Sequence, residues 1–233
     1  MAELEKFEKE NKFEKFDRLE KPNLYEKVIS IVGFDIFQVF GESGTCKTTF
    51  ALELAKSAIK QGKKVVYIDT ERNVSETPPG VEYYYAPEIN EISDFLRNPP
   101  KADVYILDSV GFALVGEIAE KGRKYIQDLI QKVQAWAYIL KKMTYRHKAL
   151  ALLINQPKST FRSGENINVE EIPPVGGKLI FGTKEVWRTS IAKMTAESTI
   201  AHVTAWRSRK YGRGRVLFEI KVSDAGTVVK PLV

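Results

Sequence analysis

Short apolar runs, punctuated by glycine, define the elements of this chain. Residues 28–40 are apolar and rich in β-branched and aromatic side chains, and the run ends at Gly41, which predicts a buried strand leading into a tight loop. Apolar residues recur at helical spacing over 48–60, and Gly62 is a typical helix stop. The run KVVYID at 64–69 predicts the next strand. This order of elements indicates a βαβ unit with parallel strands.

The middle of the chain continues this alternation of helices and buried strands, whereas the last third changes to polar–apolar alternation. A polar stretch at 157–176 is long for a compact domain, and such loops are commonly functional. The pattern predicts an α/β fold with a mainly parallel sheet flanked by helices and an antiparallel β extension at the C-terminal edge. The expected elements are helices at 89–97 and 125–143 and strands at 104–107, 149–154, 185–193, 202–209, 215–222 and 227–232.

Composition fits one globular domain. The chain has 233 residues, of which 43% are hydrophobic and 28% charged. Apolar runs fall short of the roughly 20 residues that span a bilayer, and the charged start is unlike a secretory signal. We therefore expect a cytoplasmic protein without a membrane partner, with a charged segment at 1–22 and a core domain at 23–233. The net charge of +6 permits, without requiring, a polyanionic partner.

The segment GESGTCKTT follows the first predicted strand and opens the first predicted helix, which is the context of a phosphate-binding loop. Backbone N–H groups at a helix start form an anion nest, Lys47 adds a cation, and the Thr48 hydroxyl suits Mg²⁺. Cys46 stands where the usual loop has its last glycine, so we expect altered affinity or turnover. The expected nucleotide-binding residues are Gly41, Glu42, Ser43, Gly44, Thr45, Cys46, Lys47, Thr48 and Thr49.

Polar side chains end three of the predicted strands, where ligands of open α/β sheets gather. Asp108 closes VYILD and is a candidate Mg²⁺ ligand together with Thr48. Glu71 closes VVYIDTE and could deprotonate an attacking water. Gln156 follows the apolar run at 149–154. Two alternatives stay open: Asp108 could cap a helix, and Glu71 could be only a polar residue at a strand end.

Two segments concentrate positive charge. In 206–215, WRSRKYGRGR, five cations occur without an acid, which suggests a phosphate-sensing finger, a contact to the DNA backbone or a solvated hairpin tip. The cations at 141–148 end a predicted helix, where the helix dipole favours them, and we interpret these as structural. The five cations of the first segment are Arg207, Arg209, Lys210, Arg213 and Arg215.

The order of these motifs resembles the core of the RecA/RadA recombinases. The chain shows GESGTCKT, YIDTE, ILDS, LINQ, a loop closing with PPVGG and a late basic hairpin, over residues 31–233. The short form, without a preceding DNA-binding domain, is most similar to the archaeal RadB-type paralogues of RadA. The resemblance implies a RecA-like P-loop NTPase core that binds ATP and Mg²⁺, with Glu71 as the catalytic base and Lys47 and Gln156 as further catalytic residues.

The resemblance also implies contacts with DNA and with a second subunit. The first DNA-binding loop would fall at 109–124, and Gln156 would couple the nucleotide to a second loop at 157–176. Contacts to DNA would come from Lys158, Phe161, Arg162, Arg207 and Arg215. The late hairpin would lie near the nucleotide at a subunit boundary, which makes Arg209, Lys210 and Arg213 candidate nucleotide contacts. Glu165, Glu170 and Glu171 in the second loop, and the lack of the Phe-x-x-Ala segment that links RadA subunits, depart from the family pattern.

Three hypotheses follow. The first is a RecA-type ATPase that acts in DNA recombination and repair, as an accessory or mediator with weak Mg²⁺-dependent hydrolysis and DNA binding, single strands favoured. The second is a nucleotide-bound interaction module with little catalysis, which binds a recombinase partner or associates with itself at the nucleotide site. The third is a signalling ATPase of the KaiC type.

Overall fold

The computed structural model describes residues 23–157 and 182–233, and the segment expected at 1–22 lies outside this part of the chain. The order of elements alternates strands and helices up to β5 and then consists of strands. The elements are α2 (Leu24–Val32), β1 (Ile36–Phe40), α3 (Lys47–Lys60), β2 (Val65–Asp69), β3 (Val81–Tyr85), α4 (Ile89–Arg97), β4 (Val104–Asp108), α5 (Val110–Lys121), η1 (Arg123–Tyr125), α6 (Ile126–His147), β5 (Leu150–Asn155), β6 (Glu185–Met194), β7 (Ser198–Arg207), β8 (Val216–Ser223) and β9 (Gly226–Pro231).

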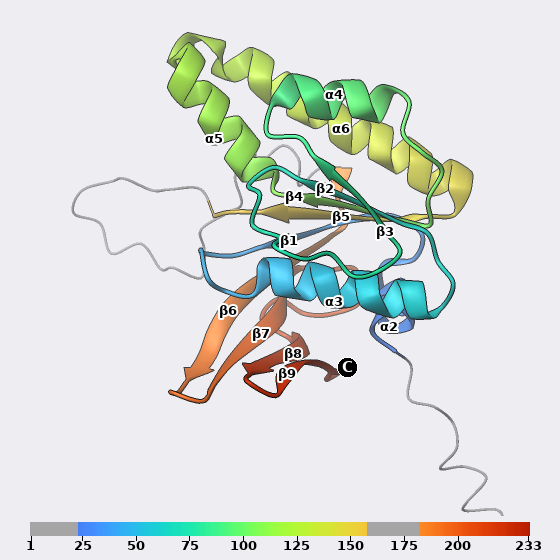
Figure 1. Ribbon diagram of the computed structural model, residues 1–233, viewed down its shortest axis with the longest axis vertical. Helices are drawn as coiled ribbons and strands as arrows, with labels where there is room; N and C mark the ends of the chain where they lie inside the picture. The colour runs from blue at the N-terminus through green and yellow to red at the C-terminus, as the bar shows by residue number, and fades with distance from the viewer. Residues whose placement is uncertain (1–22, 158–181) are drawn as a thin grey trace, which may run out of the picture.

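In the described ranges the strands form one sheet with the order β3-β2-β4-β5-β1-β6-β7-β8-β9. The first six strands of this order, from β3 across to β6, pair in parallel with their neighbours. The strands from β6 to β9 pair antiparallel. Helices α4, α5 and α6 cover one face of the parallel part, and α2 and α3 cover the other (Figure 1). The predicted fold class, a mainly parallel α/β sheet with an antiparallel C-terminal extension, is confirmed.

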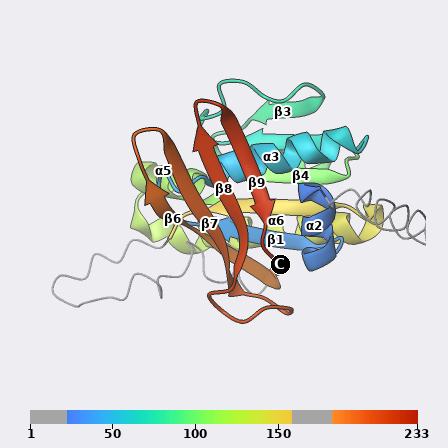
Figure 2. The same cartoon turned by 90° about the horizontal axis from the view of Figure 1, so that it is seen from below.

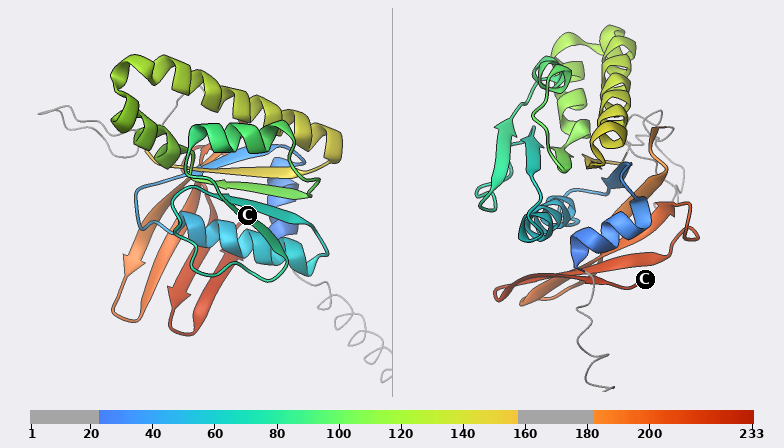
Figure 3. Two further views of the ribbon diagram at one scale, coloured as in Figure 1. Left: turned by 45° about the horizontal axis from the view of Figure 1, so that its top comes forward. Right: turned by 90° about the vertical axis from the view of Figure 1, so that its right-hand side faces the viewer.

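Each face of the sheet carries its own hydrophobic core. The first core joins α2 and α3 to inward residues of β1, β2, β4 and β5, and to Trp187, Phe218 and their neighbours in the extension. The second core lies between the sheet and helices α4, α5 and α6, around Trp136. The extension bends beneath α3, so that β9 contacts both α2 and α3 (Figures 2 and 3). The extension is therefore a wall of the first core.

Helix α2 corrects the strand predicted over residues 28–40, since only residues 36–40 are extended. Asn23 forms a capping box with Glu26, and Gly33, at φ +76°, ends the helix. Leu24, Val28 and Ile31 turn inward at helical spacing, a period that an almost continuous apolar run conceals.

Strand β3 and helix α5 are further differences from the sequence-based prediction. Residues 110–121 are helical rather than a loop, because the Ser109 hydroxyl caps the helix by accepting a hydrogen bond from the Phe112 N–H. Strand β3, VEYYY, lies at an edge of the sheet and is only partly buried, so its apolar pattern is weak. In the described ranges, every helix is too short or too polar to cross a membrane.

Candidate nucleotide-binding site

The phosphate loop, residues 41–49, begins where β1 ends, and its first turn is fixed by the neighbouring strand β6. A Cβ on Gly41 would lie 2.2 Å from Thr189 Oγ1 and 2.6 Å from Thr45 Oγ1, so only glycine fits. The hydroxyls of Thr45 and Thr189 share a hydrogen bond of 2.7 Å. Thr45 Oγ1 also lies 2.8 Å from the Glu42 carbonyl oxygen. The extension therefore supports the loop directly.

The start of α3 is open toward the loop. Cys46 is the N-cap residue, and its side chain makes no capping hydrogen bond. The first N–H groups of a helix lack intrahelical partners, so they and the helix dipole favour an anion at this end. Cys46 has φ +65° and ψ 27°, a left-handed conformation that costs a residue with a Cβ roughly 1–2 kcal/mol. Its thiol packs against the first core, and burial raises its pKa.

Lys47 is the first residue of α3, and its side chain is buried. Its Nζ donates a hydrogen bond of 2.7 Å to the Glu42 carbonyl oxygen across the loop. Burial lowers the pKa of Lys47, and the carboxylates of Asp108 and Glu71 partly oppose this shift. A buried cation whose only hydrogen-bond partner among the described residues is a carbonyl group would be stabilised by an anionic ligand.

Asp108 ends β4 beside the head of α3. Its Oδ2 accepts hydrogen bonds from the Thr48 hydroxyl at 2.8 Å and from the Tyr67 hydroxyl at 2.7 Å. Burial raises the pKa of Asp108 to about 6, although both hydrogen bonds act in the opposite direction. A carboxyl group must lose its proton to bind a metal ion, so a cation here would compete with that proton. The carboxylate and hydroxyl oxygens fit the ligand chemistry of Mg²⁺.

Glu71 lies beside this pair, just after β2. One carboxylate oxygen accepts a hydrogen bond from the Ser109 hydroxyl, and the other accepts one from Asn73 Nδ2 at 2.7 Å. Strands β2 and β4 are adjacent, with Asp69 paired with Asp108, so their ends bring the two candidate carboxylates together. The structure thus gathers Lys47, Thr48, Asp108 and Glu71 at one edge of the sheet.

Asp69 organises the turn that carries Glu71. Its carboxylate accepts hydrogen bonds from the backbone N–H groups of Glu71 and Arg72, both at 2.9 Å. It also accepts bonds from the Val74 N–H at 3.2 Å and from the Tyr83 hydroxyl at 2.9 Å. A carboxylate with this many internal donors shapes the turn rather than taking part in chemistry.

Gln156 follows β5 and lies against the first turn of α5. A Cβ on Gly111 would lie 3.5 Å from Gln156 Cβ and 3.0 Å from Asn155 Oδ1. The Gln156 backbone N–H donates to Asn155 Oδ1 at 2.8 Å. Gln156 therefore lies beside Gly111, two residues after Ser109, which contacts Glu71. The candidate DNA contacts Lys158, Phe161 and Arg162 lie outside the described residues.

The basic hairpin, residues 207–215, does not join the phosphate loop of the same chain. It connects β7 to β8 at the amino end of β1, where the Arg209 N–H donates to Glu185 at 2.8 Å and Lys210 Nζ donates to the Ser30 carbonyl oxygen. Arg213 folds back over Trp206, with Cζ 5.3 Å from the ring centre, and the Trp206 ring lies 5.6 Å from that of Phe40.

Sequence reasoning missed the residues that support the candidate side chains. Tyr67 donates to Asp108, Ser109 donates to Glu71, and Thr189 fixes the loop at Gly41. A polar group in the apolar strand VVYID, two residues before Asp69, is a signal for Tyr67. Thr189 is far from the loop in sequence, so its role follows only from the pairing of β6 with β1.

Known proteins resemble the chain in both sequence and fold, although no protein-family model matches it. A DNA repair and recombination protein RadB from Methanococcus maripaludis is 27% identical over 202 residues, covering 78% of this chain and 86% of that protein. One from Methanobrevibacter smithii is 50% identical over 40 residues, 17% of each chain.

Solved structures resemble the fold. A crystal structure of the RadB recombinase has a TM-score of 0.60 and 18% identity, covering 87% of this chain and 96% of that one. A KaiC-like protein from Pyrococcus horikoshii has a TM-score of 0.58 and 15% identity, covering 85% and 90%. Both agree with a RecA-like arrangement of the sheet and its helices.

Proposed function

Because this chain belongs to the RecA/RadA family and is of its RadB type, we propose that it binds ATP with Mg²⁺, hydrolyses ATP slowly and acts in DNA recombination and repair as an accessory or mediator. The observation that carries the proposal is the buried Asp108 carboxylate bonded to the Thr48 hydroxyl, one residue after Lys47. The names of the RadB relatives support the link to recombination and repair. Residues 23–233 would form the ATPase core.

Each side chain has a defined part in this proposal. Lys47 would exchange its bond to the Glu42 carbonyl oxygen for the phosphates, with backbone N–H groups at the start of α3 as further donors. Thr48 and Asp108 would hold Mg²⁺, which when bound neutralises phosphate charge. Glu71, oriented by Ser109 and Asn73, would accept the proton of an attacking water.

The proposal extends to partners. Gln156, next to the first turn of α5, would link the nucleotide site to the loop that follows it. DNA, preferably single-stranded, a recombinase and a second copy at the nucleotide site are the proposed partners. Arg209, Lys210 and Arg213 would then contact the nucleotide across the subunit boundary.

A second candidate is a nucleotide-bound interaction module with little catalysis. The left-handed Cys46 favours it, because a side chain in that conformation strains the loop that must fit closely around phosphates. A KaiC-type signalling ATPase is a third candidate, which the fold of the KaiC-like neighbour supports.

Calorimetry of ATP binding with and without Mg²⁺ tests the central claim, on the parent and on Thr48→Val. We expect the variant to lose most of the gain in affinity that Mg²⁺ gives, because a methyl group replaces the ligand hydroxyl. Thr199→Val, a half-buried position on β7 far from the loop, is the matched control and should retain the gain. An equal gain in all three proteins would refute the proposed metal site.

Phosphate release, measured with and without single-stranded DNA, then separates the candidates. Turnover that DNA stimulates supports the recombination ATPase. Nucleotide binding without turnover supports the interaction module, and turnover without DNA binding supports the signalling ATPase.

A further inference from the structure

The end of the sheet opposite the phosphate loop gathers cations from three separate parts of the sequence. β1, β5 and β6 run in parallel, so their amino ends lie together, and β7 returns to this end before the basic hairpin. Helix α6 ends here too, and Lys141 Nζ binds Asp35 at 3.1 Å and the Gly182 carbonyl oxygen at 3.3 Å. The hairpin, the α6 terminus and Lys184 therefore border one face of the molecule.

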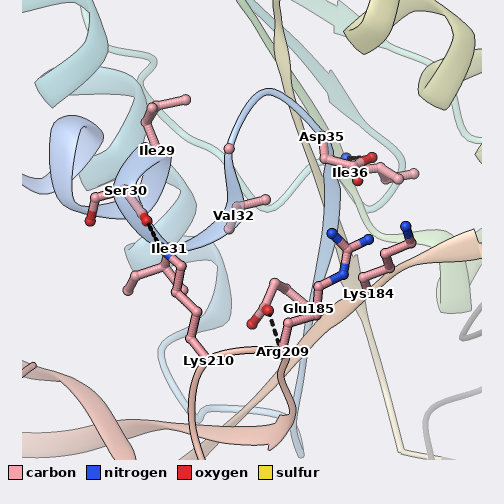
Figure 4. Close-up of a pocket in the computed structure, with 11 residues that line it drawn as sticks. Ile29, Ser30, Ile31, Val32, Asp35, Ile36, Lys184, Glu185, Arg209 and Lys210 are labelled. Atoms are coloured by element: carbon pink, nitrogen blue, oxygen red, sulfur yellow. Dashed lines mark hydrogen bonds between the residues drawn. The ribbon is translucent and has the colours of Figure 1, made fainter.

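A cavity of about 240 Å³ opens in this face. The last turn of α2 and the start of β1 form an apolar wall, and the start of β6 and the basic hairpin form the polar side. The side chains of Lys184 and Arg209 project side by side from this polar side toward Asp35 and Ile36 (Figure 4). The polar lining is Ser30, Asp35, Lys184, Glu185, Arg209 and Lys210.

The acids of this lining are already engaged by the protein. Asp35 accepts hydrogen bonds from the Ile36 N–H at 2.8 Å and from Lys141 at 3.1 Å. Glu185 accepts one from Trp187 Nε1 at 3.1 Å and one from the Arg209 N–H at 2.8 Å. Their charge is thereby directed at internal donors rather than at the cavity opening.

The cations divide into anchored and available groups. Lys210 is anchored, because its Nζ donates to the Ser30 carbonyl oxygen in the last turn of α2. That turn has no basic residue of its own, so Lys210 offsets the negative end of the helix dipole. The Lys184 ammonium and the Arg209 guanidinium are exposed and bond to none of the side chains or carbonyl groups in the described ranges. Two cations on one rim therefore have unmet capacity for an anion.

We infer that this face is a second nucleic-acid-binding surface, on which backbone phosphates contact Lys184 and Arg209 at the cavity rim and continue along the hairpin and the α6 terminus. It lies at the end of the sheet opposite the phosphate loop, and it does not require bound nucleotide. The ligand is a polynucleotide rather than an isolated anion, because the cations extend well beyond one cavity. The inference goes beyond the proposed ATPase, and ATP binding at the phosphate loop can hold with or without it.

Two features favour nucleic acid over an acidic protein. The guanidinium group, which recurs four times in the hairpin, matches phosphate with paired hydrogen bonds. Tyr138 and Tyr145 on α6 are 72% and 87% exposed, Tyr145 lies one helical turn after Lys142, and Lys148 directly follows the end of the helix. Exposed aromatic rings among cations are typical of surfaces on which unpaired bases stack, so we expect a preference for single strands.

The test is a salt titration of affinity for a fluorescein-labelled poly-dT oligonucleotide, measured by anisotropy without nucleotide. The double variant Lys184→Gln, Arg209→Gln removes two phosphate contacts. Its plot of log affinity against log salt should be shallower by about 1.4, the single-strand value for two contacts. The matched control is Lys193→Gln, Lys221→Gln, which removes the same charge from two exposed positions opposite Ile200 in the extension. We expect the control to keep the parent's slope.

Three results would overturn the inference. They are an equal slope for the test and control variants, an unaltered parent that does not bind the oligonucleotide, and poly-glutamate that binds as tightly as poly-dT at equal charge. Calorimetry of ATP binding on the parent and on the single variant Lys184→Gln, a residue with no part in the proposed nucleotide site, keeps the two functions apart. Normal ATP binding by Lys184→Gln, together with the reduced slope of the double variant, supports the inference, whereas failure of ATP binding in every protein counts only against the proposed ATPase.

Discussion

The two ends of the parallel strands show opposite uses of charge. At the carboxyl end, Asp108 and Lys47 are buried and interlocked with hydroxyl and carbonyl groups. At the amino end, Lys184 and Arg209 are exposed, and the acids are engaged by internal donors. Buried charges have perturbed pKa values and are suited to one ligand in one geometry, whereas exposed cations suit an extended polyanion whose affinity depends on salt.

This comparison teaches that the density of charge in a sequence is a poor guide to the kind of site. The run at 206–215 is the most basic part of the chain, yet it lies away from the phosphate loop that carries the single buried lysine of the described residues. The two kinds of site differ in how deeply their charged side chains are buried, and burial depends on which strands pair across the sheet. The following changes test the carboxyl end, from the largest expected effect to the smallest.

Glu71→Gln should keep ATP–Mg²⁺ binding and reduce hydrolysis by about 100- to 10,000-fold, because the amide retains the shape but cannot accept a proton. Phosphate release under single-turnover conditions measures the effect. Glu76→Gln, an exposed acid in the same loop, is the control and should hydrolyse normally. If Glu71→Gln turns over like its parent, Glu71 only supports the turn and the base lies elsewhere.

Lys47→Ala should weaken ATP binding by about 10- to 100-fold, the range of a lost charge-assisted hydrogen bond. Calorimetry measures the affinity, and thermal unfolding checks that the fold is intact. Lys60→Ala, in the exposed last turn of the same helix, removes equal charge and should bind ATP like the parent. Unchanged affinity in Lys47→Ala would remove the central claim about this end of the sheet.

Asp108→Asn should stabilise the protein at neutral pH while abolishing the metal site. The rise in pKa from 3.8 to about 6 corresponds to about 3 kcal/mol of disfavoured charge, of which weaker hydrogen bonds from Tyr67 and Thr48 offset part. We expect a net gain of about 1–2 kcal/mol in the free energy of unfolding at pH 7.5.

The sign of the pH dependence sharpens this test. The pKa of Asp108 is higher in the folded state than in the unfolded state. Its favourable contribution to the free energy of unfolding is therefore complete below a pH of about 3.8 and is lost as the pH rises through about 6. The advantage of Asp108→Asn over the parent should therefore grow between these values and then level off. Urea unfolding at several pH values measures it, and a constant difference would show that Asp108 titrates normally.

Cys46→Gly should tighten ATP binding by about five-fold, equivalent to about 1 kcal/mol, because glycine adopts φ +65° without strain. Cys46→Ala is the control, since it removes the thiol and keeps the Cβ. A gain in the glycine variant alone assigns the effect to the backbone. A loss of affinity in both variants would show instead that the loop depends on the thiol packed against the first core.

The sequence predicted the parts of the fold whose signals are local. The βαβ unit around the phosphate loop and the antiparallel extension follow from glycine positions and from the period of apolar residues. Helix α2 was wrongly predicted as a strand because the capping pair Asn23 and Glu26 was not recognised before an apolar run. Helix α5 was missed because its start, at Ser109, coincides with the expected loop.

The candidate site was predictable only in part. Lys47, Thr48, Asp108 and Glu71 stand in recognisable local patterns, and parallel strand ends bring them together. The supporting contacts of Tyr67 and Thr189 depend on which strands are neighbours, and the local sequence of a single strand does not predict its neighbours in the sheet. The position of the basic hairpin depends on the same pairing of β6 with β7, which sends the chain back to the amino end of β1.

The Trp206 side chain is an intrinsic fluorescence probe. Its ring touches Phe40, which directly precedes the phosphate loop, and lies under the Arg213 guanidinium of the hairpin. Trp136 and Trp187 are fully buried in the two cores, so their emission should stay constant while the fold persists. A change in intrinsic fluorescence on adding a ligand would then come chiefly from Trp206. A titration without any label would thus report on both regions through one indole.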